Sequence, residues 1–584
     1  MVMNNIFYKP YVENNKDFPA ARFPYTREKL MERPIFPTYI FDGGASFFML
    51  DVFKTNNSDK ILELILSGEL FEYYTFEGKF DWSGVFKKFY RLGFLHEWEA
   101  HIWLNRLYIL LPVAQAYLKT KDKKYAKIWY EILMDWFKNN PYKTYENEVN
   151  DMIWIDMQVA WRTINMVHSM YMFGEGDAFT EEEWHSIYDL LKLHANQLYK
   201  EGSEHTKLKS ADNHQLQVGM ALIMLGTLMP EIFPYYKEYI ETGKKIVAIN
   251  MKYSIYDDGV NNEDSITYSH FIARLYLEAE LFLKNNGYET VERCAELIQK
   301  QYEFLYHFST RQNKTLQIGD GYSMNAVEDI EFVNSFYPLD FCREKKSMIF
   351  EHSRMAVLRN ERFEVFVDAM DMQEWHQHYG RPHYAVYIDS KPFVVDSGSV
   401  NYDRYDLRAR LNSASAHNVI ECHDLPVEKH LEKTEAKECL SFENYDISGE
   451  KQTLVVKNVI KHPDGRFVSW VRTFTLTSDL LLVEDSVEAS EKMHFTSYVH
   501  THNSINGYYN FDKPVQPVEN GYTKLNNRYD TALYSVESSS PFSVDYDPCV
   551  DDKNTMSYTK VIKRNYFEKA FSETTKIIAP KEFY

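Results

Sequence analysis

The chain has 584 residues, of which 45% are hydrophobic and 26% are charged, and its formal net charge is −20. This length exceeds what a single hydrophobic core usually supports, so at least two domains are expected. The excess of negative charge disfavours nucleic acid or an anionic membrane surface as a partner, because both would be repelled.

The first residues of the chain and its cysteine content indicate in which cellular compartment the protein is expected. The first residues, MVMNNIFYKPYVENNKDF, lack the basic segment and apolar run of a secretory signal. No stretch reaches the ~20 continuous apolar residues of a membrane span, and five cysteines argue against a disulfide framework. We therefore expect a cytoplasmic protein, or a periplasmic or secreted one if the native chain carries a leader. The sequence leaves open whether the protein forms a homodimer.

From about residue 40 to residue 340, apolar residues recur at helical spacing. Between Tyr125 and Phe137 they follow the pattern i, i+3, i+4, i+7 and i+8. Thr180 and Glu183 have the spacing of a capping box, which predicts the start of a helix. Further helices are predicted at about 101–118, 215–228, 234–250, 265–285 and 289–308. Serial helices with short connections indicate antiparallel hairpins in a bundle or a ring.

After about residue 345 the period of the apolar residues becomes two. Segments such as Glu364–Asp368 are typical of strands, and residues 454–471 form the clearest hairpin, with Pro-Asp-Gly in its turn. This half is predicted to be an antiparallel β-sandwich. The expected organisation is a helical domain over residues 1–345 and a β-domain over residues 346–584.

Two motifs in the helical half place polar side chains at helix starts. Asn213 and His214 stand just before an apolar helix, where a helix cap is the simplest interpretation. Tyr268 lies at the opening of a later helix, after an acidic turn. Carboxylates of that turn could supply the acid and base of an inverting glycoside hydrolase. They are Asp257, Asp258, Glu263 and Asp264.

Three histidines fall within eight residues of the β half: His376, His378 and His383. Asp396 and His417 follow in later segments. A histidine, an aspartate and a second histidine from separate strands can form a three-ligand metal site with an open position, so His378, Asp396 and His417 are candidate ligands. A hydrogen-bonded network of the same residues inside the sandwich fits about as well.

Taken together, these segments resemble the heparinase II/III family of lyases. The run WHQHYGRPHYAVYIDSKPFVVDSG, followed by SAHNVI, resembles the β-domain signature of that family. Asn213-His214 resembles its active-site Asn-His, Asp258-Gly259-Val260 with Tyr268 its Asp-Gly segment and catalytic tyrosine, and Trp103-Leu104-Asn105-Arg106 its Trp-x-x-Arg helix. The resemblance implies an incomplete (α/α) toroid followed by an antiparallel β-sandwich.

The resemblance also implies β-elimination on glycans that contain 4-O-linked hexuronate, with an unsaturated uronate as the product. Asn213, together with His214, would hold the uronate carboxylate, whose charge must be neutralised before the neighbouring C5 proton becomes acidic. Tyr268 and His376 would transfer protons, and which of them is base and which is acid is left open. Heparin or heparan, hyaluronan or chondroitin, and alginate-like substrates all fit.

By the same resemblance, His378, Asp396 and His417 would hold a divalent metal, with zinc expected, that stabilises the β-domain rather than acting on the substrate. An anionic glycan also needs positive charge and polar contacts near the site, since the whole chain repels it. The candidate substrate-binding residues are Trp103, Arg106, Arg162, Gln217, Arg381 and His383.

Other functions fit parts of the sequence. An inverting hydrolase would release reducing ends without a new double bond, but it leaves the segments around His376 and His417 unexplained. A non-catalytic glycan-binding protein would use aromatic residues, which make up 16% of the chain, as a stacking surface. Binding alone does not need the set of Asn213, Tyr268 and His376. A metal hydrolase centred on the three candidate ligands is a weaker alternative.

Overall fold

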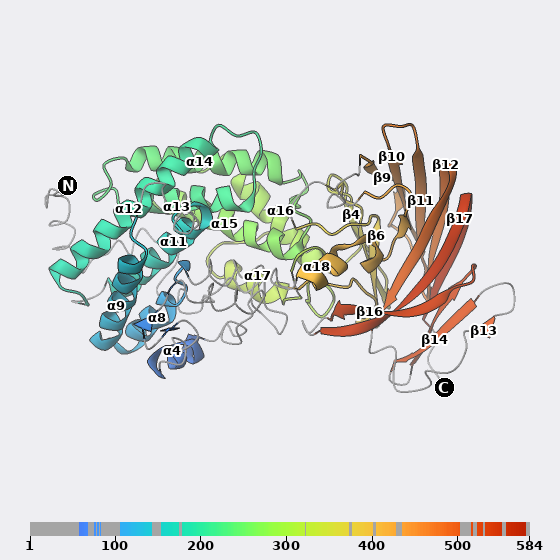
Figure 1. Ribbon diagram of the computed structural model, residues 1–584, viewed down its shortest axis with the longest axis horizontal. Coiled ribbons are helices and arrows are strands. Elements are labelled where there is room, and N and C mark those ends of the chain that lie inside the picture. Colours follow the sequence, from blue (N-terminus) through green and yellow to red (C-terminus); the bar gives the residue numbers. More distant parts are fainter. Residues whose placement is uncertain are drawn as a thin grey trace.

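The computed structural model has its helices at one end and its strands at the other (Figure 1). It describes residues 58–67, 75–76, 79–80, 82, 105–142, 153–174, 178–321, 323–372, 376–400, 405–427, 435–502, 516–517, 523–529, 532–551 and 556–579. Trp103 therefore lies outside the described residues.

The helical half is built from helices joined mostly by short connections, as predicted. They are α4 (Ser58–Ser67), α8 (Leu110–Thr120), α9 (Lys123–Asn139), α11 (Asp156–Phe173), α12 (Glu181–His205), α13 (Asn213–Leu228), α14 (Tyr236–Ser254), α15 (Ile266–Asn285), α16 (Cys294–His307) and α17 (Ala326–Asn334). A short hairpin of β1 (Thr75–Phe76) and β2 (Lys79–Phe80) accompanies them. In the part of the chain that the structure describes, no helix is both long and apolar enough to cross a membrane.

The predicted start of α12 is confirmed in detail. The Thr180 hydroxyl accepts a hydrogen bond from the Glu183 amide (3.3 Å), and the Glu183 carboxylate accepts one from the Thr180 amide (2.7 Å). This reciprocal capping satisfies two amides that have no partner inside the helix.

Helix α13 lies at the centre of the helical half and packs against α11, α12, α14 and α15. All of its residues are buried except His214, so its apolar sequence fits a position enclosed on every side. Close packing on α14 depends on glycines: a Cβ on Gly243 would lie 2.5 Å from the Gly219 carbonyl oxygen. This helix holds Asn213 and His214 on a rigid support.

The β half is antiparallel throughout. Its strands are β3 (Met348–Phe350), β4 (Met355–Arg359), β5 (Phe363–Asp368), β6 (His383–Ile388), β7 (Lys391–Val394), β8 (Ile420–Cys422), β9 (Lys437–Asp446), β10 (Gln452–Lys461), β11 (Phe467–Leu476), β12 (Leu480–Thr501), β13 (Gln516–Pro517), β14 (Thr523–Tyr529), β15 (Ala532–Ser538), β16 (Ser543–Val550) and β17 (Met556–Ile578). Helix α18 (Tyr405–Asn412) and a short 3-10 helix, η5 (Ala414–Ala416), interrupt them.

The long strand β12 organises this half, because it pairs with β11, β17, β7 and β8. The predicted hairpin is confirmed: β10 pairs with β11 from Gln452↔Leu476 to Lys461↔Phe467, around the Pro-Asp-Gly turn. Figure 1 shows β10, β11, β12 and β17 side by side at the far end of the molecule, while α18 lies near the junction of the two halves.

Buried polar contacts join the two halves. The Asp258 carboxylate accepts hydrogen bonds from the amide (2.8 Å) and the hydroxyl (3.0 Å) of Ser353. Arg359 in β4 donates to the carbonyl oxygens of His307 (2.7 Å) and Ser309 (2.8 Å), at the end of α16. Because each of these donors and acceptors finds its partner in the other half, the contacts hold the two halves in a fixed arrangement. Side chains from both halves can therefore share one site.

Candidate active site

Two of the predicted catalytic residues, one from each half, stack on one another. The rings of Tyr268 and His376 have centroids 3.6 Å apart and planes inclined by 14°. Tyr268 lies in the first turn of α15, where the Ser265 hydroxyl accepts a hydrogen bond from its amide (3.3 Å). His376 lies between β5 and β6, outside any strand, with a left-handed backbone (φ 76°). Such a conformation is costly for a residue with a side chain and often marks a functional site.

A buried carboxylate, Asp320, holds His376 from behind. It accepts hydrogen bonds from His376 Nδ1 (3.1 Å), His378 Nε2 (3.3 Å), Arg408 (2.6 Å) and Ser399 (3.2 Å), and its own amide donates to the His376 carbonyl oxygen (2.8 Å). Burial alone would raise the pKa of Asp320, but Arg408 and the two histidines hold it well below its usual range. An anionic Asp320 keeps a proton on His376 Nδ1, so Nε2 is the nitrogen available for chemistry.

The loop that carries Asp320 requires glycine on both sides. Gly319 has φ 67°, and a Cβ there would lie 2.3 Å from the Asp264 carbonyl oxygen and 2.8 Å from that of His376. A Cβ on Gly321 would lie 2.0 Å from the Thr267 hydroxyl. Asp320 was not among the residues predicted from the sequence. An aspartate between two glycines in a segment without periodicity was the available signal.

Asn213 and Glu263 lie next to His376. The Asn213 amide donates to Glu263 Oε2 (3.1 Å), and this oxygen lies 3.6 Å from His376 Nε2. Burial raises the pKa of Glu263, with His376 and Asn213 opposing the change. Asn213, Glu263, Tyr268 and His376 therefore form one connected group, hereafter the central cluster.

Gln217 stands one helical turn after Asn213. It is fully buried, and its amide donates to the Asn213 carbonyl oxygen (3.2 Å). At this position Gln217 supports Asn213 from inside the helical half, and its binding of substrate stays a prediction.

The two arginines predicted to bind substrate from the helical half are both buried. Arg106 is 5% exposed and donates to the Gln158 side chain (3.0 Å). Arg162 is fully buried, and its guanidinium donates to His194 Nε2 (2.8 Å) and to the carbonyl oxygens of Asn105 (2.8 Å) and Ile153 (3.0 Å). This burial favours a structural role for Arg162, and its binding of substrate stays a prediction that the variant described next would test.

Replacing Arg162 with methionine is expected to lower the free energy of unfolding by about 3 kcal/mol, because three buried acceptors would lose a charged donor. Denaturant unfolding of the variant would measure the change. In an activity assay at a temperature where the variant is folded, KM should stay close to that of the wild type. A large rise in KM without loss of stability would instead restore Arg162 as a substrate-binding residue.

Arg381 and His383, predicted to bind substrate, are also interior groups in the structure. Arg381 is 3% exposed, forms ion pairs with Asp264 and with Asp368 (3.0 Å), and donates to the His378 carbonyl oxygen. Burial lowers the pKa of His383 to about 3, and its Nε2 lies 3.2 Å from an Asp396 oxygen. Both side chains support the segment that carries the candidate metal ligands.

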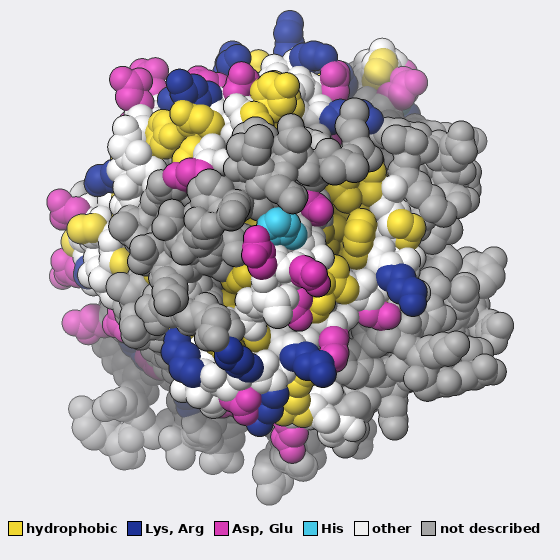
Figure 2. Space-filling model, turned by 90° about the vertical axis from the view of Figure 1, so that its left-hand side faces the viewer, with side chains coloured by type: hydrophobic (Ala, Val, Ile, Leu, Met, Phe, Trp, Pro, Cys, Tyr) yellow, Lys and Arg dark blue, Asp and Glu magenta, His cyan; other side chains and the backbone are white. Residues whose placement is uncertain are grey.

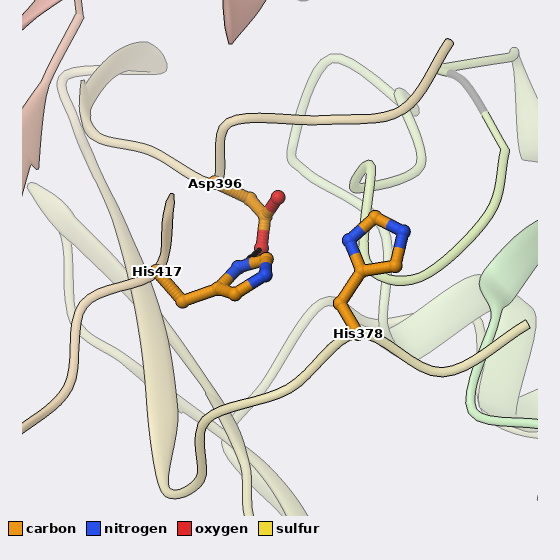
Figure 3. A group of neighbouring side chains, drawn as sticks. All are labelled: His378, Asp396 and His417. Atoms are coloured by element: carbon orange, nitrogen blue, oxygen red, sulfur yellow. Dashed lines mark hydrogen bonds and ion pairs between the residues drawn. The ribbon is translucent and has the colours of Figure 1, made fainter. Parts of the chain in front are cut away.

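The three predicted metal ligands do come together. One ligand atom each of His378, Asp396 and His417 lies within 4.8 Å of the others, and Figure 3 shows the two imidazoles and the carboxylate gathered from three separate segments. His417 Nδ1 lies 2.8 Å from Asp396 Oδ2. His378 Nδ1 and His417 Nε2 are buried without a hydrogen-bond partner among the described residues. Buried nitrogens of this kind are costly unless something binds them, so the donor set fits a cation such as zinc.

Comparison with known proteins agrees with this arrangement. Two family models match the chain: "Heparinase II/III N-terminus" over residues 52–340 and "Heparinase II/III-like, C-terminal" over residues 343–564. A heparin-sulfate lyase of Bacteroides thetaiotaomicron is 31% identical over 176 residues, which cover 30% of this chain and 24% of that protein. A heparin-sulfate lyase of Pedobacter heparinus is 25% identical over 183 residues, or 30% of this chain and 26% of that protein. Each match thus spans about a quarter of the curated relative.

Solved structures resemble the chain over most of its length. A crystal structure of heparinase III has a TM-score of 0.72 at 16% identity, covering 99% of this chain and 94% of that one. A heparan sulfate lyase from Pedobacter heparinus has a TM-score of 0.60 at 16% identity, covering 95% and 88%. This likeness confirms the predicted fold class, an incomplete helical toroid followed by an antiparallel β-sandwich. From the two matching family models and the shared fold, we conclude that the chain belongs to the heparinase II/III family.

Proposed function

We propose that this protein is a polysaccharide lyase that cleaves 4-O-linked hexuronate glycans by β-elimination, with heparin or heparan sulfate as the first substrate class. The observation that carries the proposal is the central cluster, in which Tyr268 of the helical half stacks on His376 of the β half beside Asn213. The curated relatives, both named heparin-sulfate lyases, support this substrate class.

The reaction needs a group that neutralises the uronate carboxylate, and Asn213 at the start of α13 would meet it, with His214 beside it. The amide of Asn213 already donates to a carboxylate, that of Glu263. Burial raises the pKa of Glu263, with His376 and Asn213 opposing the change. A neutralised carboxylate makes the neighbouring C5 proton acidic enough to remove.

The two proton transfers would involve His376 and Tyr268. Since Asp320 accepts from Nδ1 of His376, the other ring nitrogen, Nε2, would take the C5 proton. The electron pair of the broken C–H bond then forms the double bond between C4 and C5, and the bond from C4 to the glycosidic oxygen breaks. The Tyr268 hydroxyl would donate its proton to that oxygen. In a substrate of the opposite stereochemistry, Tyr268 would serve as the base as well.

A divalent cation, with zinc as the best match, would bind His378, Asp396 and His417. It would cross-link three segments of the β half, and no step of the elimination passes through it. His378 also donates to Asp320 through Nε2 (3.3 Å), so the same histidine would contribute to the support of His376. Binding of a metal ion by residues from separate segments commonly stabilises the folded domain that contains them.

The carboxylates of the acidic turn do not favour an inverting hydrolase. Asp257 is exposed and pairs with Arg293 (2.8 Å), Asp258 binds Ser353, and Asp264 pairs with Arg381. Of the four carboxylates that the sequence analysis named, only Glu263 belongs to the central cluster. The other three have structural partners, whereas inversion needs two carboxylates that flank the scissile bond.

A panel of uronic-acid glycans, sulfated and unsulfated, tests the proposal. The expected result is a rise in the ultraviolet absorbance of the unsaturated uronate with heparin or heparan sulfate. Reducing ends released without this absorbance would replace elimination by hydrolysis. Absence of any product across the whole panel would overturn the assignment to these substrates.

A further inference from the structure

His214 is the one residue of α13 that reaches out of the buried interior, and a carboxylate holds it there. Its Nδ1 lies 2.5 Å from Asp156 Oδ2, and the two side chains are 45% and 31% exposed. The pair therefore borders solvent next to Asn213, whose amide belongs to the central cluster. Neither Asp156 nor this contact could be read from the sequence, because 58 positions separate the two residues.

The backbone of Asp156 is held in an uncommon conformation. Asp156 opens α11 with φ 59°, in the left-handed region that residues with a side chain rarely adopt. Its amide donates to Glu201 Oε2 (2.7 Å), and the Gln197 amide donates to the other oxygen of Glu201 (2.5 Å). Strain of this kind persists only where the surroundings impose it, and it gathers at binding and catalytic sites. The contacts of its backbone thus hold the Asp156 carboxylate in place.

The charged groups around His214 favour its cationic form. Burial would lower the pKa of His214, but the contact with Asp156 outweighs burial and raises it. Asp212 acts in the same direction, while Arg106 opposes it. The titratable and charged groups that face the pair from the neighbouring elements are Arg106, Glu201, His205, Asp212 and Glu263.

A local cation matters in this protein because its overall charge opposes an anionic substrate. The formal net charge is −20, and Figure 2 shows acidic and basic side chains interspersed on the helical end. Arg162 and Arg381, which the sequence offered as sources of positive charge, are buried and bonded to protein groups. His214 also stands in the first turn of α13, where the helix dipole favours anions. Positive charge at this point would therefore act directly on a bound anion.

We propose that Asp156 is a positioning residue that holds His214 as an imidazolium, with Nε2–H directed at an anionic oxygen of the glycan. This inference rests on the proposed lyase function and deepens it by naming a specificity element. The anionic oxygen belongs either to a uronate carboxylate or to a sulfate ester. A carboxylate contact would act on every uronate substrate, whereas a sulfate contact would act on sulfated substrates alone.

Steady-state kinetics of Asp156→Asn across pH test the proposal. Asparagine keeps the size of the side chain and an acceptor for His214, but it removes the charge. Because loss of a close opposite charge lowers a histidine pKa by about one unit or more, KM should rise by about tenfold at pH values above both pKa values and by less at lower pH, with a smaller change in kcat. The imidazolium is present below the pKa of His214, so the rise of KM with pH should begin at lower pH in the variant.

The matched control is Asp424→Asn, which removes the partner of an exposed histidine, His494 (3.0 Å), on the β half. Its KM should equal that of the wild type. A rise of KM for sulfated and unsulfated substrates alike would assign the contact to the uronate carboxylate, and a rise for sulfated substrates alone would assign it to sulfate. A fall of kcat in Asp156→Asn with unchanged KM would overturn the proposal.

A titration without substrate separates this inference from the proposed function. Histidine NMR signals of the free protein, with His214 assigned through His214→Gln, should show a pKa lower by about one unit in Asp156→Asn than in the wild type. Equal pKa values would overturn the role of Asp156 whatever the enzyme does. A wild-type protein that produces no unsaturated uronate, but shows this shift, would contradict the lyase assignment and leave the charged pair established.

Discussion

Replacing His376 with alanine is expected to lower kcat by about a hundredfold to ten-thousandfold, because a positioned proton-transfer group contributes a factor of this size. His376 stacks on Tyr268, lies 3.6 Å from Glu263 and is oriented by Asp320, so an alanine would remove the nitrogen that faces the substrate. The rate of formation of unsaturated uronate measures the effect. His494→Ala, which removes an exposed histidine of β12, is the control and should keep wild-type kcat.

Tyr268→Phe separates the hydroxyl of Tyr268 from its ring. Phenylalanine retains the stacking on His376 and removes only the proton donor, so a loss of kcat on the same scale is expected with little change in thermal stability. Full activity in this variant would exclude the hydroxyl from the chemistry and leave the ring as packing. Full activity in His376→Ala would end the assignment of the base to the β half.

Removal of divalent metal is expected to lower the stability of the β half more than it lowers kcat. His378 Nδ1 and His417 Nε2 are buried without a hydrogen-bond partner among the described residues, so a bound cation would satisfy both. A ligand present at about a thousand times its Kd stabilises the folded state by about 4 kcal/mol. Thermal unfolding with a chelator, and again after zinc is restored, measures this change.

The variant Asp396→Asn tests the metal site through a single ligand. The variant keeps the volume of the side chain but loses the anionic ligand, so its unfolding temperature should no longer respond to chelator or to zinc. His423→Ala removes a histidine that is not a candidate metal ligand, so the unfolding temperature of this variant should still respond to chelator and zinc. A wild-type protein whose unfolding temperature is unchanged by chelator would show that the three residues form a hydrogen-bonded network instead of a metal site.

Local patterns predicted the secondary structure because the forces behind them are local. The apolar period separates helices from strands, the capping box at Thr180 places the start of α12, and the turn at residues 463–465 places the hairpin of β10 and β11. Helix starts remained uncertain by a few residues: the helix predicted at 289–308 is α16, Cys294–His307. Strands were predicted less reliably where the alternation of apolar and polar residues is weak. Residues 376–378, for example, form no strand in the structure.

Residue types alone could not distinguish exposed from buried basic groups. Arg162, Arg381 and His383 have the chemistry of anion binders, but each is buried among protein acceptors. An arginine or histidine in the interior must find partners there, and those partners are distant in sequence. Sequence patterns therefore identified basic residues but could not show that these three are enclosed by protein groups.

By itself, the sequence determined the two-part architecture and offered Asn213, Tyr268 and His376 as candidate catalytic residues and His378, Asp396 and His417 as candidate metal ligands. Only the tertiary structure decided how these groups are supported. Asp320 lies 56 positions from His376, and Asp156 lies 58 positions from His214. Periodicity and capping act over a few residues, whereas a carboxylate that orients an imidazole is brought to it by the packing of separate helices and loops. That packing is what turns scattered polar residues into a site.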